Sequence, residues 1–279
     1  MSVGTLYIVA TPIGNLADMT FRAVEVLQNV DVIACEDTRH SQRLLHHYSV
    51  DKPLVSLHSF NEKERGEGLV ARLLEGASVA VISDAGTPLI NDPGFDLVRR
   101  ARAAGVMVTP VPGPSSVTAA LSVSGLPMQR FCFEGFVPAK KQARLVFLTA
   151  LERETRAMVF FETPHRILES LEAMATVFGE QREVMVAREL TKRFETIVEA
   201  SFTEVLETMK VRGQSQKGEF VIVVQGESKQ NSDEDTAELD EVLGILLEEL
   251  SVSRAAAVAA RICGCHKNKA YKRALDLEK

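Results

Sequence analysis

Short, almost wholly apolar runs alternate with helix-like segments through the first third of the sequence. The apolar runs are 6–10, 31–35, 54–57, 79–83 and 106–111. Segments with helical periodicity separate them, as at 21–27, 64–74 and 95–104. A strand that is apolar on both faces needs helices on both sides, as in a parallel sheet. The pattern therefore predicts an α/β domain whose parallel strands end at one edge of the sheet.

A second group of apolar runs begins near residue 130 and predicts another sheet. Its expected strands are 130–134, 157–161, 183–188, 195–200 and 219–225. Less helical sequence separates the last three, which favours a mixed sheet. The Ser-Gly-Leu-Pro stretch at 124–127 is typical of a hinge. We therefore divide this part of the chain into an N-terminal α/β domain, residues 1–124, and a second α/β domain, residues 125–227.

The composition changes near residue 227. Residues 228–237 are polar and acidic without an apolar period, which predicts a solvated acidic linker. Amphipathic patterns then predict helices at 239–250, 253–262 and 267–277. These helices would form a small C-terminal helical appendage over residues 238–279.

The predicted appendage is locally basic, although the chain carries a formal net charge of −6. Its cations are Arg254, Arg261, Lys267, Lys269, Lys272, Arg273 and Lys279. Such a local excess suits contact with phosphates, and Tyr271 could stack on a base. A solvated basic helix without a partner is the alternative interpretation.

Three loops rich in Pro and Gly follow strands of the first predicted sheet. They are 10–15, 83–94 and 111–116. Open α/β sheets bind ligands at the carboxyl ends of their strands, and the last loop opens a helix whose amides suit a carboxylate or hydroxyl. Gly86 allows close approach of a ligand, and Asp84 and Asp92 suit hydroxyl or ammonium groups. For Asp92 the alternative is capping of the helix that starts at Gly94.

The cysteines do not form a metal-binding pattern. No C-x-x-C pair occurs, and the Cys-Gly-Cys-His run at 263–266 has neither ligand spacing nor a second ligand pair. We therefore expect no metal. The sequence also lacks a signal-peptide flank and an apolar stretch of membrane-spanning length. We expect a cytoplasmic protein with no membrane partner.

Several segments together resemble one known family. They include 4–18 (GTLYIVATPIGNLAD), 34–40 (ACEDTRH), 84–94, 131–138, 161–166 and 187–192. These segments are similar to those of the bacterial 16S rRNA (cytidine-2′-O)-methyltransferases, a branch of the tetrapyrrole methylase superfamily. The similarity runs from Gly4 to the C-terminus. It implies two α/β domains with the cofactor cleft between them, followed by the small helical appendage.

The resemblance implies S-adenosyl-L-methionine as the cofactor, bound in that cleft. Carried over position by position, the cofactor-facing residues are Pro12, Gly86, Thr87, Ile90, Ser115, Ser116, Phe161 and Glu162. Thr87 stands where the wider superfamily commonly has the Asp of a Gly-Asp-Pro motif, which argues against a tetrapyrrole substrate. The resemblance also implies a homodimer whose partner is 16S rRNA, with the assembled 30S subunit as the expected form. The sequence itself does not distinguish free rRNA from the assembled subunit.

The implied activity is 2′-O-methylation of a cytidine ribose in the decoding centre of 16S rRNA. The cofactor's methyl group is already activated, so the protein mainly aligns the acceptor, and a base that accepts the hydroxyl proton would help. Asp37 and Asp84 are the candidate bases, with Glu36 and Glu189 behind them. Each carboxylate has a salt bridge with a nearby arginine as its alternative role. The sequence does not select the base.

Several cations are expected to hold RNA phosphates. They are Arg39, Arg188, Arg254, Lys267, Lys269, Lys272 and Arg273.

Two other functions compete with rRNA methylation as the interpretation of this sequence. One is a methyltransferase of the same superfamily acting on a small tetrapyrrole or a modified protein side chain, which the 36–39 loop, Thr87 and the basic appendage oppose. The other is a nucleotide-binding regulatory module without chemistry, which any detected methyl transfer would exclude.

Overall fold

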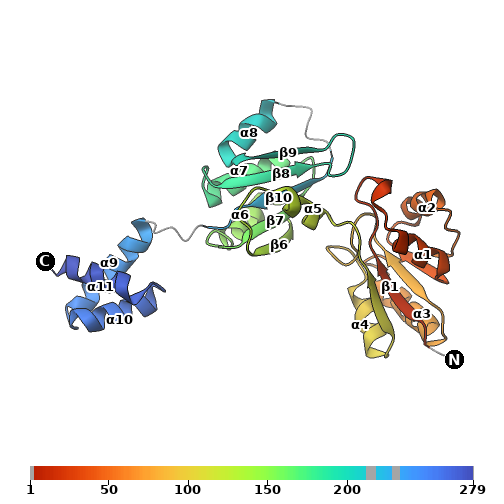
Figure 1. The fold of residues 1–279 in the computed structure, drawn as a ribbon, viewed down its shortest axis with the longest axis horizontal. Helices are drawn as coiled ribbons and strands as arrows, with labels where there is room; N and C mark the ends of the chain where they lie inside the picture. The colour runs from red at the N-terminus through yellow and green to blue at the C-terminus, as the bar shows by residue number, and fades with distance from the viewer. Residues whose placement is uncertain (1–2, 212–217, 228–232, 279) are drawn as a thin grey trace. The chain divides into compact units, whose positions relative to one another are not determined.

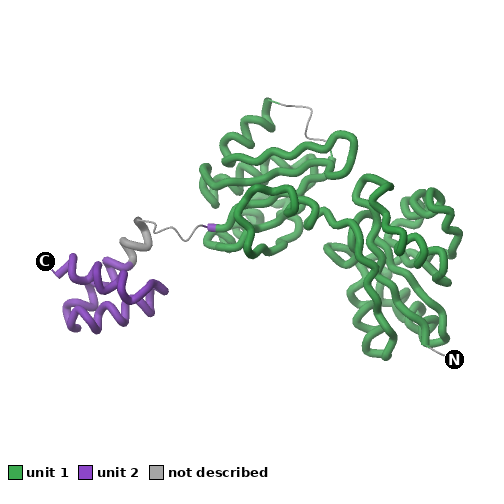
Figure 2. Tube along the Cα trace, in the orientation of Figure 1, with its two compact units in different colours: residues 1–226 green, residues 227–279 purple. Residues whose placement is uncertain are grey.

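The computed structural model describes residues 3–211, 218–227 and 233–278, with side chains for all of these except 233–238. The chain divides into two compact units, residues 1–226 and 227–279 (Figure 2). The larger unit holds two sheets, and the described part of the smaller one contains helices and no strand. Across the described ranges, no helix has both the length and the apolar character needed to cross a bilayer.

The first sheet is five-stranded and parallel (Figure 1). Its strands are β1 (Thr5–Val9), β2 (Val32–Cys35), β3 (Leu54–Ser56), β4 (Val79–Ile82) and β5 (Met107–Val111), in the order β3-β2-β4-β1-β5. β2 and β4 are buried at every position, which is why their sequences lack polar alternation. The predicted parallel α/β architecture is confirmed.

Helices cover both faces of this sheet. They are α1 (Phe21–Asn29), α2 (Thr38–His47), α3 (Glu62–Leu74) and α4 (Phe95–Ala103). Val79 and Val81 of β4 pack in one core cluster with side chains of α3 and α4. Ala80 and Ile82 point the other way and pack with side chains of α1 and α2. The alternation of side chains along a strand thus separates the two cores.

The second sheet is mixed, as predicted. Its strands are β6 (Phe131–Phe136), β7 (Ala157–Glu162), β8 (Glu183–Arg188), β9 (Thr196–Ser201) and β10 (Phe220–Val224), in the order β6-β7-β10-β8-β9. β6 and β7 are parallel, whereas the other neighbours are antiparallel. The sheet brings the carboxyl end of β7 next to the start of β10.

Different helices pack on the two faces of the second sheet. α6 (Lys141–Thr149), α7 (Ile167–Phe178) and α8 (Phe202–Val211) pack on one face around Phe160. On the other face, Val117 and Ala120 of α5 (Ser116–Val123) pack against the sheet. α5 follows the last strand of the first sheet, so its amino end lies where the two domains meet.

The stretch that the sequence predicts as a hinge is tied to the second sheet. The Glu199 carboxylate on β9 accepts a hydrogen bond from the Gly125 amide at 2.8 Å and from the Ser124 hydroxyl at 3.2 Å. A Cβ atom at position 125 would lie 2.5 Å from Glu199 Oε1, so a larger residue here would displace the Glu199 carboxylate. The contact fixes the end of α5 against β9.

The smaller unit has three helices in its described part: α9 (Asp233–Leu247), α10 (Val252–Ile262) and α11 (Lys267–Leu277). α9 begins before the predicted helix, so residues 233–237 of the predicted linker are helical. Acidic residues at a helix amino end are favoured by the helix dipole, and the sequence pattern does not distinguish them from a solvated linker. Residues 228–232 of the predicted linker lie outside the described residues.

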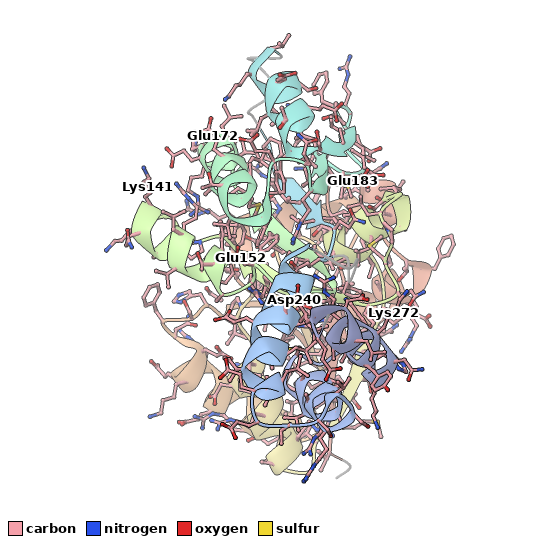
Figure 3. The ribbon with its side chains drawn as sticks, turned by 90° about the vertical axis from the view of Figure 1, so that its left-hand side faces the viewer. Lys141, Glu152, Glu172, Glu183, Asp240 and Lys272 are labelled. Atoms are coloured by element: carbon pink, nitrogen blue, oxygen red, sulfur yellow. The ribbon has the colours of Figure 1, made fainter. Side chains whose placement is uncertain are left out.

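The core of the smaller unit consists largely of alanine. Its buried residues are Leu239, Leu243, Ala255, Ala256, Ala259, Ala260, Ala270 and Ala274. Such small side chains let helices approach closely. A two-pronged ion pair adds to this packing, because the Arg273 guanidinium on α11 contacts both oxygens of Asp240 on α9 at 2.6 and 2.5 Å. Figure 3 shows Asp240 on α9 and Lys272 on α11.

Candidate active site

A cavity of about 330 Å³ opens where loops of the first domain meet β7 and β10 of the second. The first domain contributes Ile13, Asp84, Ala85, Gly86, Thr87, Ile90, Asn91, Asp92, Ser115 and Ser116. The second contributes Phe136, Phe161, Glu162, Thr163, Pro164, Leu190, Glu219, Phe220 and Val221. All three loops predicted from the sequence reach this cavity.

The first two loops are joined by backbone hydrogen bonds. The Thr11 amide donates to the Gly86 carbonyl at 2.9 Å, and the Gly86 amide donates back to the Thr11 carbonyl at 3.1 Å. Gly86 has φ 82°, and a Cβ there would lie 3.2 Å from Ile13 Cγ2. Glycine is therefore required at this position. Pro12, predicted to face the cofactor, is not among the cavity residues, and its neighbour Ile13 takes that place.

The second loop is also joined to the third. The Thr87 hydroxyl donates to the Pro114 carbonyl at 3.0 Å and fixes the approach to α5. Ser115 is the N-cap of α5, but its side chain makes no capping hydrogen bond. The first amides of the helix therefore remain available at the cavity, where Ser115 and Ser116 lie. They suit an electron-rich group of a ligand.

Aromatic rings form part of the opposite wall. The Phe161 ring on β7 lies with its centroid 4.8 Å from that of Phe133 and 5.5 Å from that of Phe136, both edge to face. Phe136 and Phe161 line the cavity. This wall suits the flat face of a nucleobase.

Glu162 lines the cavity, yet its carboxylate is already bonded within the second domain. Its oxygens accept hydrogen bonds from the Ser170 hydroxyl at 2.5 Å and the Thr163 amide at 2.7 Å. Arg166 forms an ion pair with it at 2.8 Å. The side chain is buried, so these contacts compensate for its removal from water. Its geometry fits a residue that shapes the end of β7.

Of the four candidate bases, only Asp84 lines the cavity. Asp37 is the N-cap of α2, and its carboxylate accepts from the Arg39 amide at 2.8 Å and the His40 amide at 3.3 Å. These backbone hydrogen bonds hold the pKa of Asp37 below its usual range. Asp84 in turn accepts from the Asp37 amide at 3.3 Å. Glu36 borders a separate, smaller cavity beside Asp92.

Glu189 lies next to the cavity but is not among its lining residues. It accepts from Lys192 Nζ at 2.8 Å and from the Glu219 amide at 3.0 Å. Burial raises the pKa of Glu189, but these hydrogen bonds and the positive charges of Lys192 and Arg188 outweigh it, so the net shift is downward. A carboxylate with a lowered pKa is a weak base.

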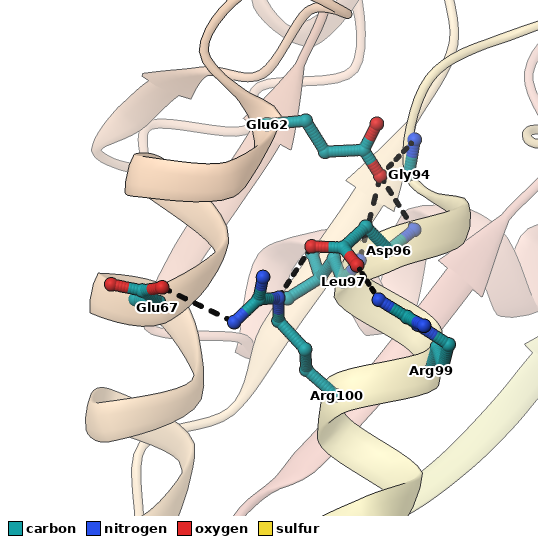
Figure 4. A network of polar contacts seen from close by, with 7 residues as sticks. All are labelled: Glu62, Glu67, Gly94, Asp96, Leu97, Arg99 and Arg100. Carbon is teal, nitrogen blue, oxygen red and sulfur yellow. Dashed lines mark hydrogen bonds and ion pairs between the residues drawn. The ribbon is translucent and has the colours of Figure 1, made fainter.

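The alternative role for Asp92, capping of α4, is wrong. The cap of α4 is Glu62, which lies on the neighbouring helix α3 (Figure 4). Glu62 Oε1 accepts from the amides of Gly94 at 3.1 Å, Asp96 at 2.7 Å and Leu97 at 3.4 Å. The sequence pattern missed this because the cap comes from a residue far earlier in the chain. Asp92 lies instead on the wall of the cavity.

Asp92 has an unusual electrostatic environment for a carboxyl group. Burial, together with the negative charges of Glu36 and Asp84, raises its pKa to about 6 against the opposing effect of a hydrogen bond with Ser83. Asp92 lines the cavity, as expected for a residue predicted to bind hydroxyl or ammonium groups, whereas its neighbour Asn91 is a cavity residue that the sequence did not single out. The sequence feature that indicates a place at the cavity for both residues is that they belong to the same loop as Gly86.

Several second-domain residues of the cavity were not predicted, because the sequence marks them only weakly. Leu190 and the 219–221 segment belong to strands or strand ends far from Phe161 in the sequence. The antiparallel pairing of β10 with β7 and β8 brings them to the cavity, since Phe220 lies opposite Glu162 and Arg188 in the register. No local pattern encodes such a pairing.

The cations expected to hold RNA are distributed over both units. Arg39 is exposed in the first turn of α2, and Arg188 ends β8 beside the cavity. In the smaller unit, Arg254, Lys267 and Lys272 are exposed, and Lys269 is partly exposed. Arg273 differs from these because its guanidinium is held by Asp240. That contact gives Arg273 a structural role.

Two family models match the chain. One is described as Tetrapyrrole (Corrin/Porphyrin) Methylases and matches residues 5–206. The other is described as RsmI C-terminal HTH domain and matches residues 233–278. The chain belongs to the tetrapyrrole methylase family, and within it to the group defined by the relatives described next.

The chain is similar over nearly its whole length to curated bacterial proteins. It is 51% identical to "Ribosomal RNA small subunit methyltransferase I" of Escherichia coli O157:H7, over 99% of this chain and 96% of that protein. It is 52% identical to the protein of the same name from Xylella fastidiosa, over 96% and 98%.

A solved structure of the same fold is also similar. The uroporphyrin-III C-methyltransferase of Thermus thermophilus complexed with S-adenyl homocysteine has a TM-score of 0.55 and 18% identity, over 80% of this chain and 98% of that one. At this level of identity the likeness establishes the fold alone.

Proposed function

We propose that the protein transfers a methyl group from S-adenosyl-L-methionine to the ribose 2′-hydroxyl of a cytidine in the decoding centre of 16S rRNA. The observation that carries this proposal is the cavity itself. It combines aromatic and amide groups suited to a nucleoside cofactor with carboxylates at the carboxyl edge of the first sheet. The relatives named as ribosomal RNA small subunit methyltransferases supply the substrate class.

The cavity fits the proposed cofactor in size and chemistry. Its volume of about 330 Å³ lies in the usual range for small-molecule sites, roughly 300–1,000 Å³. Gly86, Thr87 and Ile90 would contact the cofactor from the second loop, and Ser115 and Ser116 would do so from the start of α5. Phe161 would pack against it from the second domain. When bound, the cofactor supplies an electrophilic methyl group, and the protein aligns the acceptor hydroxyl with it.

The smaller unit is the proposed RNA-binding appendage. Its family model is described as a helix-turn-helix domain, a motif whose second helix contacts nucleic acid in many proteins. α10 and α11 are joined by a short turn, and Lys267 and Lys272 are exposed on α11 beside the exposed ring of Tyr271. Cations and an aromatic ring on one helix suit phosphates and an unstacked base.

The proposed substrate form is the assembled 30S subunit, and the proposed oligomer is a homodimer that works in the cytoplasm, where ribosomes are. A small tetrapyrrole or a modified protein side chain is the competing acceptor. Thr87 opposes it, because the wider superfamily commonly has the Asp of a Gly-Asp-Pro motif at that position. The 36–39 loop and the basic appendage oppose it as well.

Transfer of tritium from labelled S-adenosyl-L-methionine tests this function. The acceptors are 30S subunits, free 16S rRNA and 70S ribosomes, each from a strain that lacks the enzyme. We expect label in the RNA of the 30S subunits and little in the other two. Absence of label from every RNA, despite measured cofactor binding, would contradict the proposal and favour a small acceptor.

A further inference from the structure

One ionisable group in the cavity, Asp92, does not cap the helix that follows it. Asp92 lies in the loop between β4 and α4, and its side chain borders both the main cavity and the smaller cavity beside Glu36. The loop is held in a strained shape, because Leu89 and Asn91 have φ values of 71° and 66° without being glycine. Strain of this kind is usually retained where a site needs a fixed geometry.

The neighbouring Asn91 anchors this shape against the second domain. A Cβ on Gly135 of β6 would lie 2.9 Å from Asn91 Nδ2, so the amide of Asn91 packs directly on that glycine. Gly135 itself has φ 72° and lies at the irregular register step of β6. The contact places the residue before Asp92 against the other wall of the cavity.

Asp92 is also not needed for helix capping. Glu62 accepts the hydrogen bonds of the first amides of α4. Among the described residues, no backbone amide donates to the Asp92 carboxylate. Asp37 and Glu189, by contrast, are both held by backbone amides. The Asp92 carboxylate thus has a hydrogen bond with Ser83 but no backbone donor, and it lies on the cavity wall, where a substrate hydroxyl can reach it.

The charges around Asp92 make it a stronger base than an ordinary aspartate. Burial has the largest effect, and the charges of Glu36 and Asp84 add to it, while Ser83 opposes them, so that its pKa rises to about 6. Glu162 and Glu219 line the opposite wall of the cavity, and Cys35 borders the smaller one. Within the described ranges, both charged groups that act on Asp92 are carboxylates.

We propose that Asp92 is the catalytic base, the group that accepts the proton of the ribose 2′-hydroxyl. This inference rests on the methyl transfer proposed above. The O–H proton passes to the Asp92 carboxylate as the hydroxyl oxygen forms its bond to the methyl carbon. The carbon–sulfur bond breaks with its electron pair on sulfur, which leaves a neutral thioether. The protonated Asp92 then releases its proton to water.

The test is the Asp92→Asn variant, compared with wild type in single-turnover methyl transfer to the acceptor that wild type uses. General-base catalysis contributes about 10²–10⁴-fold, so we expect a rate loss of that size. For wild type the rate should rise with pH to a plateau, with a midpoint near 6. The variant loses this inflection. Asp92→Glu keeps a carboxylate and should recover part of the rate and the inflection.

Three measurements separate a base from a structural residue. The affinity for S-adenosyl-L-methionine, measured by calorimetry, should stay within about threefold of wild type in Asp92→Asn. The carboxyl carbon of Asp92, followed by NMR, should titrate near pH 6 in the protein without cofactor. The variant should also melt no lower than wild type, since it removes a charge that burial disfavours. Asp51→Asn, an exposed aspartate outside the cavity, is the matched control.

Glu36→Gln provides an independent test that keeps Asp92 in place. Removal of the Glu36 charge lowers the pKa of Asp92, so the midpoint of the pH–rate profile should move to lower pH. Wild-type rates in Asp92→Asn, loss of cofactor binding in that variant, or an unmoved midpoint in Glu36→Gln would each overturn the assignment. Inactivity of wild type on every RNA would instead defeat the proposed function, and the NMR titration would still report on Asp92.

Discussion

Glu62 Oε1 on α3 accepts a hydrogen bond from the Asp96 amide at 2.7 Å and thereby caps the amino end of α4. The same oxygen accepts from the Gly94 amide at 3.1 Å. Gly94 has no side chain to serve as a cap, so the helix depends on its neighbour. This contact links the two helices and leaves Asp92 on the cavity wall.

The first prediction concerns this cap. Glu62→Ala should destabilise the larger unit by about 1–2 kcal/mol, the usual cost of a lost helix cap. The measurement is urea-induced unfolding at neutral pH. Glu67→Ala is the matched control, because it makes the same change on the same helix and removes only an exposed ion pair with Arg100. It should cost less than about 1 kcal/mol. Equal losses in the two variants would contradict a capping role.

The second prediction concerns the contact between Asn91 and Gly135. Gly105→Ala is the reference, because Gly105 has a similar φ of 75° with open space around it. An alanine held at this positive φ at position 105 should lower the free energy of unfolding by about 1–2 kcal/mol. Gly135→Ala should cost at least about 1 kcal/mol more, since its new methyl group meets Asn91. It should also weaken cofactor binding in calorimetry, whereas Gly105→Ala should not. Equal losses of stability and of cofactor affinity in the two variants would show that the contact between Asn91 and Gly135 contributes to neither.

The third prediction concerns the smaller unit and its response to acid. The hydrogen bond from Arg273, aided by the charge of that residue, lowers the pKa of Asp240. A lowered carboxyl pKa stabilises the folded state above the unfolded value of about 3.9, and the benefit is lost as the pH falls through the folded-state value. Because both side chains are partly exposed, the benefit is at most about 1 kcal/mol.

Asp240→Asn should remove this acid sensitivity from the thermal unfolding of the smaller unit. Arg273→Lys should act similarly, because lysine lacks the planar fork that meets both oxygens. An unchanged acid transition in both variants would disprove the link between this ion pair and stability.

The fourth prediction concerns RNA affinity. The double variant Lys267→Ala and Lys272→Ala should weaken binding to the ribosomal substrate and lower the slope of log affinity against log salt by about 1.4–1.8. The measurement is filter binding over a salt series. Lys210→Ala, which removes an exposed cation of the larger unit paired with Glu172, is the control and should leave the slope unchanged. Equal slopes for all three proteins would contradict an RNA contact by α11.

The sequence was sufficient to predict both sheets. Strands such as β2 and β4 are apolar on both faces, and burial by helices is the physical result of that pattern. The three ligand loops were also predictable, because carboxyl ends of parallel strands meet at one edge. Gly86 stood out because a loop that approaches a ligand closely needs a residue without a side chain.

Contacts between distant segments were not predictable. The cap of α4 by Glu62 and the pairing of Arg273 with Asp240 depend on how helices pack. Phe220 reaches the cavity through strand pairing with residues at Glu162 and Arg188. The pKa of Asp92 is raised by burial and by the charge of Glu36, which follows a different strand. A linear pattern carries no information on such neighbours.

Mapping the methyl group itself tests the proposed function most directly. Methylated 30S subunits are digested with nuclease, and the fragments are analysed by mass spectrometry. We expect one added methyl group on the ribose of a single cytidine in the decoding centre. A methyl group on a base, on another region of the RNA or on a ribosomal protein would contradict it.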